Sequence, residues 1–254
     1  FAADFSDLGG FADIPASEAA IHFVELINCS GGIDIAAGFD INRVLATDLM
    51  YCDSPTGTMV ELTIQNIEGD PEVTQRAGQD LIDAGVSVIL GPPFPDFGEP
   101  LLQVTAGQIP VLFVASTEPS LADPDALSFL VAFDDTAQAT AGAKFALNRG
   151  WDTAVTFSAP GPYFGYNPEI FTEVFEAGGG TVINDYNFVP IDDMDFSTQA
   201  NQMAAAGEQP DVVYSAMLSF QAAVLRGQLD AAGVDTRYLI TDAFEATGGY
   251  FTDG

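Results

Sequence analysis

Short apolar runs alternate with longer amphipathic stretches along the first half of the chain. Helical periodicity is clearest at 71–84, where Val73, Ala77 and Leu81 fall on one face and a proline opens the first turn. Runs rich in β-branched residues, such as VSVIL, are typical of strands. We therefore expect helices at 16–28, 71–84 and 100–107, and strands at 59–65, 86–90 and 110–114.

The same alternation continues through the second half. We expect strands at 153–157, 181–189, 211–215 and 238–241, and helices at 136–149, 168–177, 196–206 and 220–232. Strand–helix–strand units at this spacing predict parallel sheets covered by helices on both faces, which is an α/β fold. In such folds ligands bind beyond the carboxyl ends of the strands.

Two segments depart from this rhythm. The extended stretch 127–135 is interpreted as a passage from one sheet to another, which predicts an N-terminal lobe of residues 1–133 and a C-terminal lobe of residues 134–254. The stretch 34–57 has no clear period and is interpreted as an insertion in the first lobe.

The chain has two cysteines, Cys29 and Cys52. No other Cys or His lies near them at zinc spacing, so we expect no metal site. They form either a disulfide or two buried free thiols. We favour the disulfide, which would stabilise the fold by about 3 kcal/mol in the chain-entropy model and would indicate an oxidising compartment.

Composition narrows the classes of function. Lys and Arg number 6 against 37 Asp and Glu, so the net charge is −31, and 48% of the residues are hydrophobic. This apolar content excludes a disordered acidic tail. The shortage of cations argues against binding of nucleic acid and against polybasic adhesion to membranes. No uncharged apolar run reaches the ~18–20 residues of a membrane helix, and no signal peptide is visible.

Signatures of enzymes are missing from the sequence. Neither glycine-rich phosphate motif nor a G-x-S-x-G nucleophile elbow occurs. The single histidine, His22, lies in the first expected helix and is interpreted as a packed or half-exposed helix residue. Asp192, Asp193 and Asp195 form either a weak calcium site or a solvated loop, and we favour the loop because no glycine sits at EF-hand spacing. We therefore expect no enzyme, no cofactor and no metal.

Several stretches in a shared order resemble the substrate-binding proteins of branched-chain amino acid ABC transporters, which have the type I periplasmic binding fold. These stretches are 19–33 (AAIHFVELINCSGGI), 69–92 (GDPEVTQRAGQDLIDAGVSVILGP), 109–121 (IPVLFVASTEPSL), 195–197 (DFS) and 210–214 (PDVVY). The resemblance implies two lobes, each a parallel sheet flanked by helices, with a ligand held in the cleft between them. It also implies delivery to a membrane permease, a periplasmic or cell-surface location, and a chain that is incomplete at both ends.

In the first lobe, Ala115-Ser116-Thr117 directly follows an expected strand. Backbone N–H groups and two hydroxyls at this place suit a small polar ligand, and the alternative role for the hydroxyls is a turn or a helix cap. In the second lobe, the resemblance places Asp242 where the family has an acid for the ligand ammonium, the alternative being a solvated aspartate. It places Tyr163 and Phe164, in the loop after strand 153–157, in an aromatic wall; packing without ligand contact is the alternative.

One stretch departs from the family. Where the family usually has hydroxyl residues after Gly91, this chain has Pro92-Pro93-Phe94-Pro95-Asp96. Proline has no N–H to donate, and Asp96 would repel a carboxylate. We hypothesise that the ligand is not an ordinary aliphatic amino acid but is larger, more apolar or cationic, and we include Phe94 among the candidate ligand residues.

These observations predict an extracytoplasmic solute-binding protein that closes about a hinge around a small molecule for an ABC transporter. Two other functions fit the same fold. One is a sensor or receptor ectodomain, and the other is a structural surface-assembly protein that has kept the fold without ligand binding. An α/β hydrolase has the least support, because the chain holds a single histidine.

Overall fold

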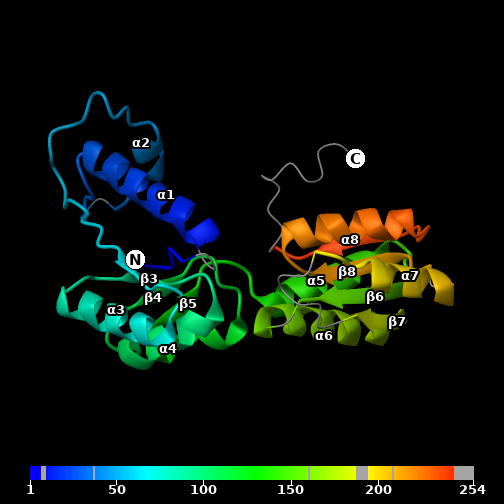
Figure 1. The fold of residues 1–254 in the computed structure, drawn as a ribbon. Coiled ribbons are helices and arrows are strands. Elements are labelled where there is room, and N and C mark those ends of the chain that lie inside the picture. Colours follow the sequence, from blue (N-terminus) through cyan, green and yellow to red (C-terminus); the bar gives the residue numbers. More distant parts are fainter. Residues whose placement is uncertain (7–9, 37, 160, 187–193, 208, 243–254) are drawn as a thin grey trace. The chain divides into compact units, whose positions relative to one another are not determined.

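Parallel pairing governs the sheets of this protein. The computed structural model describes residues 1–6, 10–36, 38–159, 161–186, 194–207 and 209–242, and within them every ladder between named strands is parallel. The chain divides into two units, Phe1–Ala132 (unit 1) and Phe133–Gly254 (unit 2), which Figure 1 traces in colour along the sequence. The α/β class with parallel sheets and flanking helices is therefore confirmed.

Unit 1 contains two small sheets. In one, β1 (Ala2–Ala3) pairs with β2 (Gln65–Asn66). In the other, β4 (Val111–Phe113) lies between β3 (Ile89–Leu90) and β5 (Ser128–Leu130). The helices are α1 (Gly10–Cys29), α2 (Ile41–Leu45), α3 (Pro71–Asp83) and α4 (Pro95–Thr105), with short 3₁₀ turns at Pro119–Leu121 and Pro124–Ala126.

The core of unit 1 forms where α3 and α4 pack against the strands. Asp70 begins α3 by accepting the amides of Glu72 and Val73 at 2.8 and 3.0 Å, which satisfies two N–H groups that the helix leaves open. Leu81 of α3 and Leu101 of α4 are completely buried in the same cluster as the strand residues. This packing fixes the strand ends from which the candidate site residues follow.

Unit 2 has one four-stranded parallel sheet in the order β7-β6-β8-β9. Its strands are β6 (Thr153–Ser158), β7 (Thr181–Tyr186), β8 (Val212–Ala216) and β9 (Arg237–Ile240). Its helices are α5 (Asp135–Asn148), α6 (Pro162–Ala177), α7 (Ser197–Ala206) and α8 (Ser219–Ala231).

The two faces of this sheet carry separate cores. Alternate residues of β6 and β8 point to opposite faces, so Ala154 and Tyr214 pack with α5 and α6, whereas Val155 and Val213 pack with α7 and α8. Figure 1 shows these helix pairs on either side of the strands. Both central strands are buried on both faces, which explains why their sequences read as continuous apolar runs.

Several strands are shorter than the sequence predicts. The run 59–65 keeps only Gln65, the first residue of β2, whereas the run 86–90 keeps the two residues of β3 and the run 110–114 keeps the three of β4. The ladders begin at Ala2↔Gln65 and Ile89↔Val111, so the earlier residues of these runs lie outside them. The segment 127–135 is expected to leave the first sheet, but its residues Ser128–Leu130 pair with β4 as the third strand of the β3-β4-β5 sheet. Apolar content favours a strand, but pairing decides its length.

Besides α1, which begins at Gly10 rather than at residue 16, two helices begin earlier than the sequence predicts. α4 begins at Pro95 rather than at residue 100, and α6 begins at Pro162 rather than at residue 168. Proline suits a first helical turn, where its missing N–H costs nothing. Each helix also holds a second proline inside it, Pro100 or Pro168, and these inner prolines are the ones that the sequence pattern took as the start.

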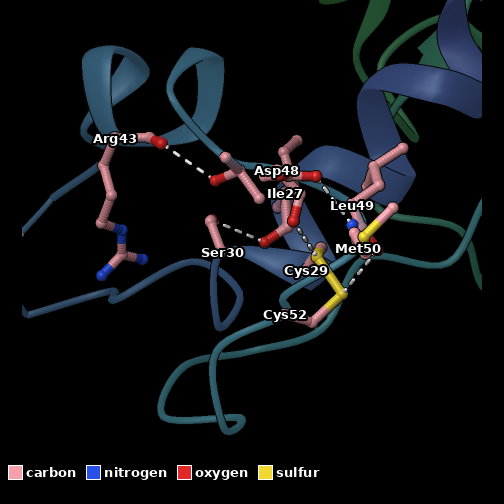
Figure 2. Close-up of a disulfide and its surroundings, with 9 residues drawn as sticks. Ile27, Cys29, Ser30, Arg43, Asp48, Leu49, Met50 and Cys52 are labelled. Carbon is pink, nitrogen blue, oxygen red and sulfur yellow. Dashed lines mark hydrogen bonds between the residues drawn. A yellow bond between two sulfur atoms is a disulfide. The ribbon is translucent and has the colours of Figure 1, made fainter.

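The insertion 34–57 is closed at its base. A disulfide joins Cys29, the last residue of α1, to Cys52, with an S–S distance of 2.01 Å. Figure 2 shows this bond beside Ser30 and the turn of Asp48, Leu49 and Met50. An antiparallel bridge between Ile33 and Thr58 adds a second closure. The predicted disulfide is confirmed, and the alternative of two free thiols is wrong.

Candidate functional site

In unit 1, the residues that follow β4 carry the candidate hydroxyls. Ala115 is exposed, whereas Ser116 and Thr117 are only 2% and 4% exposed. The Ser116 Oγ atom has no hydrogen-bond partner among the described residues. Buried hydroxyls normally have a partner, so this atom is available to a water molecule or to a bound solute.

The loop after β3 offers few donors. Gly91 donates its N–H to Leu112 O at 2.9 Å within the sheet, and Pro92, Pro93 and Pro95 have none. Phe94 takes the position before α4 without a side-chain cap, and its half-buried ring packs against the core of unit 1. Asp96 adds a carboxylate to the first turn of α4. This end of the helix is therefore poorly suited to a ligand carboxylate.

In unit 2, the structure brings three candidate residues together. The Tyr163 hydroxyl donates to Asp242 Oδ1 at 2.5 Å, and the Tyr163 and Phe164 rings meet edge to face with centroids 5.0 Å apart. Asp242 follows the end of β9, as the sequence predicts. Tyr163 and Phe164 lie in the first turn of α6, so their assignment to a loop is wrong. The cause is the early start of α6 at Pro162.

A second layer of polar residues supports this group. Asp242 donates its N–H to Gln138 Oε1 at 2.6 Å, and Gln138 Nε2 donates to Asn167 Oδ1 at 3.3 Å. Asn167 Nδ2 donates to Tyr163 O at 3.0 Å, and the Tyr214 hydroxyl donates to Asn167 Oδ1 at 3.3 Å. The sequence patterns did not indicate Gln138, Asn167 or Tyr214 as site residues. Polar residues in the first two turns of α5 and α6, near the carboxyl ends of the strands, were the signal that could have found the first two.

The electrostatics of this edge are acidic. Burial, and after it the nearby carboxylates of Asp135 and Asp242, raise the pKa of Tyr214 above its ordinary value. Tyr214 therefore stays protonated and donates its hydrogen at neutral pH. Asp135 is completely buried at the start of α5. Two carboxylates thus lie close to one hydroxyl, which favours a positively charged group as a neighbour.

Unit 1 holds another pair of carboxyl groups that the sequence analysis missed. Asp4 follows β1, and its N–H donates to Asp13 Oδ2 of α1 at 2.6 Å. Both side chains are at least 97% buried. Burial raises the pKa of Asp13 to about 6; the Asp4 amide lowers it and the Asp4 charge raises it. The pair joins the end of β1 to the first turn of α1.

The described residues contain no group of three or more His, Cys, Asp or Glu that could hold a metal. Asp192 and Asp193 of the acidic loop lie outside the described residues. Asp195 accepts from Ser197 N and Gln228 Nε2, both at 3.0 Å, and hydrogen bonds from the Ser197 side chain and backbone lower its pKa.

His22 is largely exposed, and its Nδ1 lies 3.8 Å from Glu25 Oε2. Among the described helices, none combines the length and apolarity that crossing a membrane requires.

Comparison with known families decides the identity of the fold. The sequence profile of one family, described as periplasmic binding protein, matches residues 8–249. The chain belongs to the periplasmic binding protein family. The predicted recognition and fold class are thereby confirmed, and this family consists of solute-binding proteins rather than enzymes.

Solved structures share the fold of this periplasmic binding protein. The branched-chain amino acid transporter protein LivJ from Streptococcus pneumoniae matches with a TM-score of 0.72 and 17% identity, over 94% of this chain and 62% of its own. The leucine-binding protein LivK from Thermotoga maritima matches with a TM-score of 0.61 and 24% identity, over 72% of this chain and 53% of its own. A solute-binding protein from R. palustris matches with a TM-score of 0.65 and 19% identity, over 94% of this chain and 60% of its own.

The chain spans less than two thirds of the length of the solved structures that it matches. The match covers between 51% and 62% of the similar solved structures. At identities of 16–24%, these likenesses show the fold alone. A comparison with curated proteins found no match.

Proposed function

We propose that this protein captures a small solute outside the cytoplasm and delivers it to an ABC transporter. The observation that carries the proposal is the Tyr163–Asp242 pair at the carboxyl edge of the unit 2 sheet. The unsatisfied hydroxyl of Ser116, after β4 in unit 1, supports it. Polar groups at the carboxyl ends of parallel strands are where α/β proteins hold ligands. The two units would act as the two ligand-binding lobes, with a membrane permease as partner and a periplasmic or cell-surface location.

The solute is proposed to carry a net positive charge, as L-arginine does and zwitterionic L-isoleucine does not. Asp135 and Asp242 make the edge of unit 2 acidic, and the prolines and Asp96 around the start of α4 disfavour a carboxylate. A charge-assisted hydrogen bond to Asp242 would contribute about 1.5–3 kcal/mol. The similar proteins take different solutes: LivJ was solved with isoleucine and the R. palustris protein with benzoate. The fold therefore leaves the choice of solute to the residues at the strand ends.

Isothermal titration tests this proposal with L-arginine, L-isoleucine and benzoate as probes. We expect L-arginine to bind more tightly than the other two, and we expect Asp242→Asn to weaken its binding about tenfold, which corresponds to about 1.4 kcal/mol. Asp235→Asn, an exposed aspartate after α8, is the matched control and should change nothing. Binding of benzoate alone, or of isoleucine alone at micromolar affinity, would contradict the proposed solute class.

A surface-assembly role is the second candidate, because the disulfide-closed insertion displays large apolar side chains. Ile35, Met50 and Tyr51 are 81%, 77% and 75% exposed. Large apolar side chains exposed within one short segment are candidates for an interaction site. Electron micrographs of the purified protein distinguish this role, since regular filaments or lattices would favour it and dispersed particles would not.

A further inference from the structure

Hydrogen bonds close a ring around Asp242. Starting from the Asp242 amide, the ring runs through Gln138 and Asn167 to the backbone of Tyr163. The Tyr163 hydroxyl then returns to the Asp242 carboxylate. The ring thus holds the main chain of Asp242 from one side and its carboxylate from the other, and it joins α5, α6 and the end of β9.

The inner side of the ring is anchored in the core of unit 2. Asn167 is completely buried, and Tyr214, which donates to it, is 2% exposed. The Tyr214 ring stacks on Phe171 of α6 with centroids 4.1 Å apart. Asn167 lies one helical turn after Tyr163, so the same helix that fixes the amide also fixes the phenol. The anchor is rigid because its members are packed and bonded at the same time.

The amide side chains suit their places in the ring. Gln138 uses its oxygen to accept from Asp242 and its nitrogen to donate to Asn167. Asn167 uses its oxygen to accept from Gln138 and Tyr214, and its nitrogen to donate to Tyr163 O. A carboxylate cannot donate, so Glu at position 138 or Asp at position 167 would break one bond and leave the acceptor bonds available.

We propose that Gln138 and Asn167 are positioning residues that hold Asp242 and Tyr163 as one preset recognition pair for the solute. This inference rests on the proposed function. Asp242 is exposed just after a strand, where an unsupported carboxylate would sample several rotamers and would lose that freedom on binding. The ring restricts it in advance, and preorganisation of this kind raises affinity by lowering the cost of ordering.

Amide hydrogen exchange, measured residue by residue by NMR, tests the ring without any solute. Gln138→Leu removes the acceptor of the Asp242 amide and should speed its exchange about fivefold, the factor for one net hydrogen bond of about 1 kcal/mol. Gln138→Glu keeps an oxygen acceptor and should restore slow exchange. Gln209→Leu is the matched control, because Gln209 accepts the Asp235 amide at 2.9 Å elsewhere in unit 2. This control should speed the exchange of the Asp235 amide and leave the exchange of the Asp242 amide unchanged.

Carbodiimide labelling followed by mass spectrometry reports on the Asp242 carboxylate itself. Tyr163→Phe and Asn167→Asp should each raise the labelling of Asp242 several-fold, although Asn167 forms no hydrogen bond with Asp242. Labelling of Asp211, which accepts from Asp152 and Thr153, should stay constant. Circular dichroism of each variant confirms that the fold is kept, and the labelling of Asn167→Asp carries the test where Gln138→Leu does not fold.

The outcomes separate the two proposals. Unchanged exchange of Asp242 in Gln138→Leu, or unchanged labelling in Asn167→Asp, would overturn the positioning role and leave the proposed function standing. A ring that behaves as described, in a protein that binds none of the probe solutes, would overturn the proposed function instead.

Discussion

Replacing Asp13 by Asn should stabilise unit 1 at neutral pH. Asp13 is 3% exposed, and its Oδ2 accepts the Asp4 amide at 2.6 Å beside a second buried carboxyl group, that of Asp4 itself. Burial raises the pKa of Asp13 from 3.8 to about 6. Asparagine keeps an oxygen for the Asp4 amide and carries no charge, so the variant removes the cost of burying the carboxylate.

The size and sign of the effect follow from this pKa. Between about pH 4 and about pH 6 the folded chain holds a proton on Asp13 that the unfolded chain has released. Stability therefore falls as the pH rises through this window, and the loss is complete above pH ~6. The shift of roughly two pKa units corresponds to about 3 kcal/mol. Asp13→Asn should match the wild type near pH ~4 and exceed it by as much as about 3 kcal/mol near pH ~8.

Urea unfolding at a series of pH values measures this effect. Trp151 is the single tryptophan and lies in unit 2, so a transition seen by circular dichroism but not by tryptophan fluorescence reports unit 1. Asp80→Asn, an exposed aspartate of α3, is the control and should keep the wild-type pH dependence. Equal stability of Asp13→Asn and wild type at about pH 8 would refute the reasoning.

Three further predictions concern the scaffold. Serine at both Cys29 and Cys52 should lower the free energy of unfolding of unit 1 by about 3.4 kcal/mol, because the disulfide spans 23 residues. An unchanged free energy of unfolding in urea titrations would contradict this. Gly91→Ala should cost about 1–3 kcal/mol in the same assay, because its Cβ would meet the Phe113 ring at 2.6 Å. Burial raises the pKa of Asp211, but hydrogen bonds from Asp152 and Thr153 outweigh it and lower the pKa. Asp211→Asn should therefore be less stable than the wild type in urea titrations at neutral pH, and the difference should shrink as the pH falls below ~4.

The helices of this protein could be predicted from sequence where their signals are local. Asp70 and Pro71 mark the start of α3, and the apolar face of that helix ends within a residue of the expected place. The lengths of the strands could not be predicted in the same way. The length of β2 depends on its pairing with β1, in which Gln65 lies opposite Ala2, and no local pattern encodes a contact between residues so far apart along the chain.

The candidate site likewise contains residues that a local sequence signal indicates and residues that it does not. Asp242 could be predicted because it follows a strand, and strand ends are where α/β folds place ligand residues. Gln138 and Asn167 could not be ranked above other polar helix residues, because their roles depend on which way each amide points. The Asp4–Asp13 pair was missed because one member sits inside an apolar helix and nothing nearby in the sequence indicates its partner.

Native mass spectrometry of the protein, purified without refolding, tests its role in solute capture most directly. We expect one non-covalent mass increment from a small, positively charged molecule, which Asp242→Ala abolishes and Asp235→Ala preserves. A wild-type spectrum that shows the bare chain alone, and that stays bare after addition of L-arginine, L-isoleucine or benzoate, would contradict it.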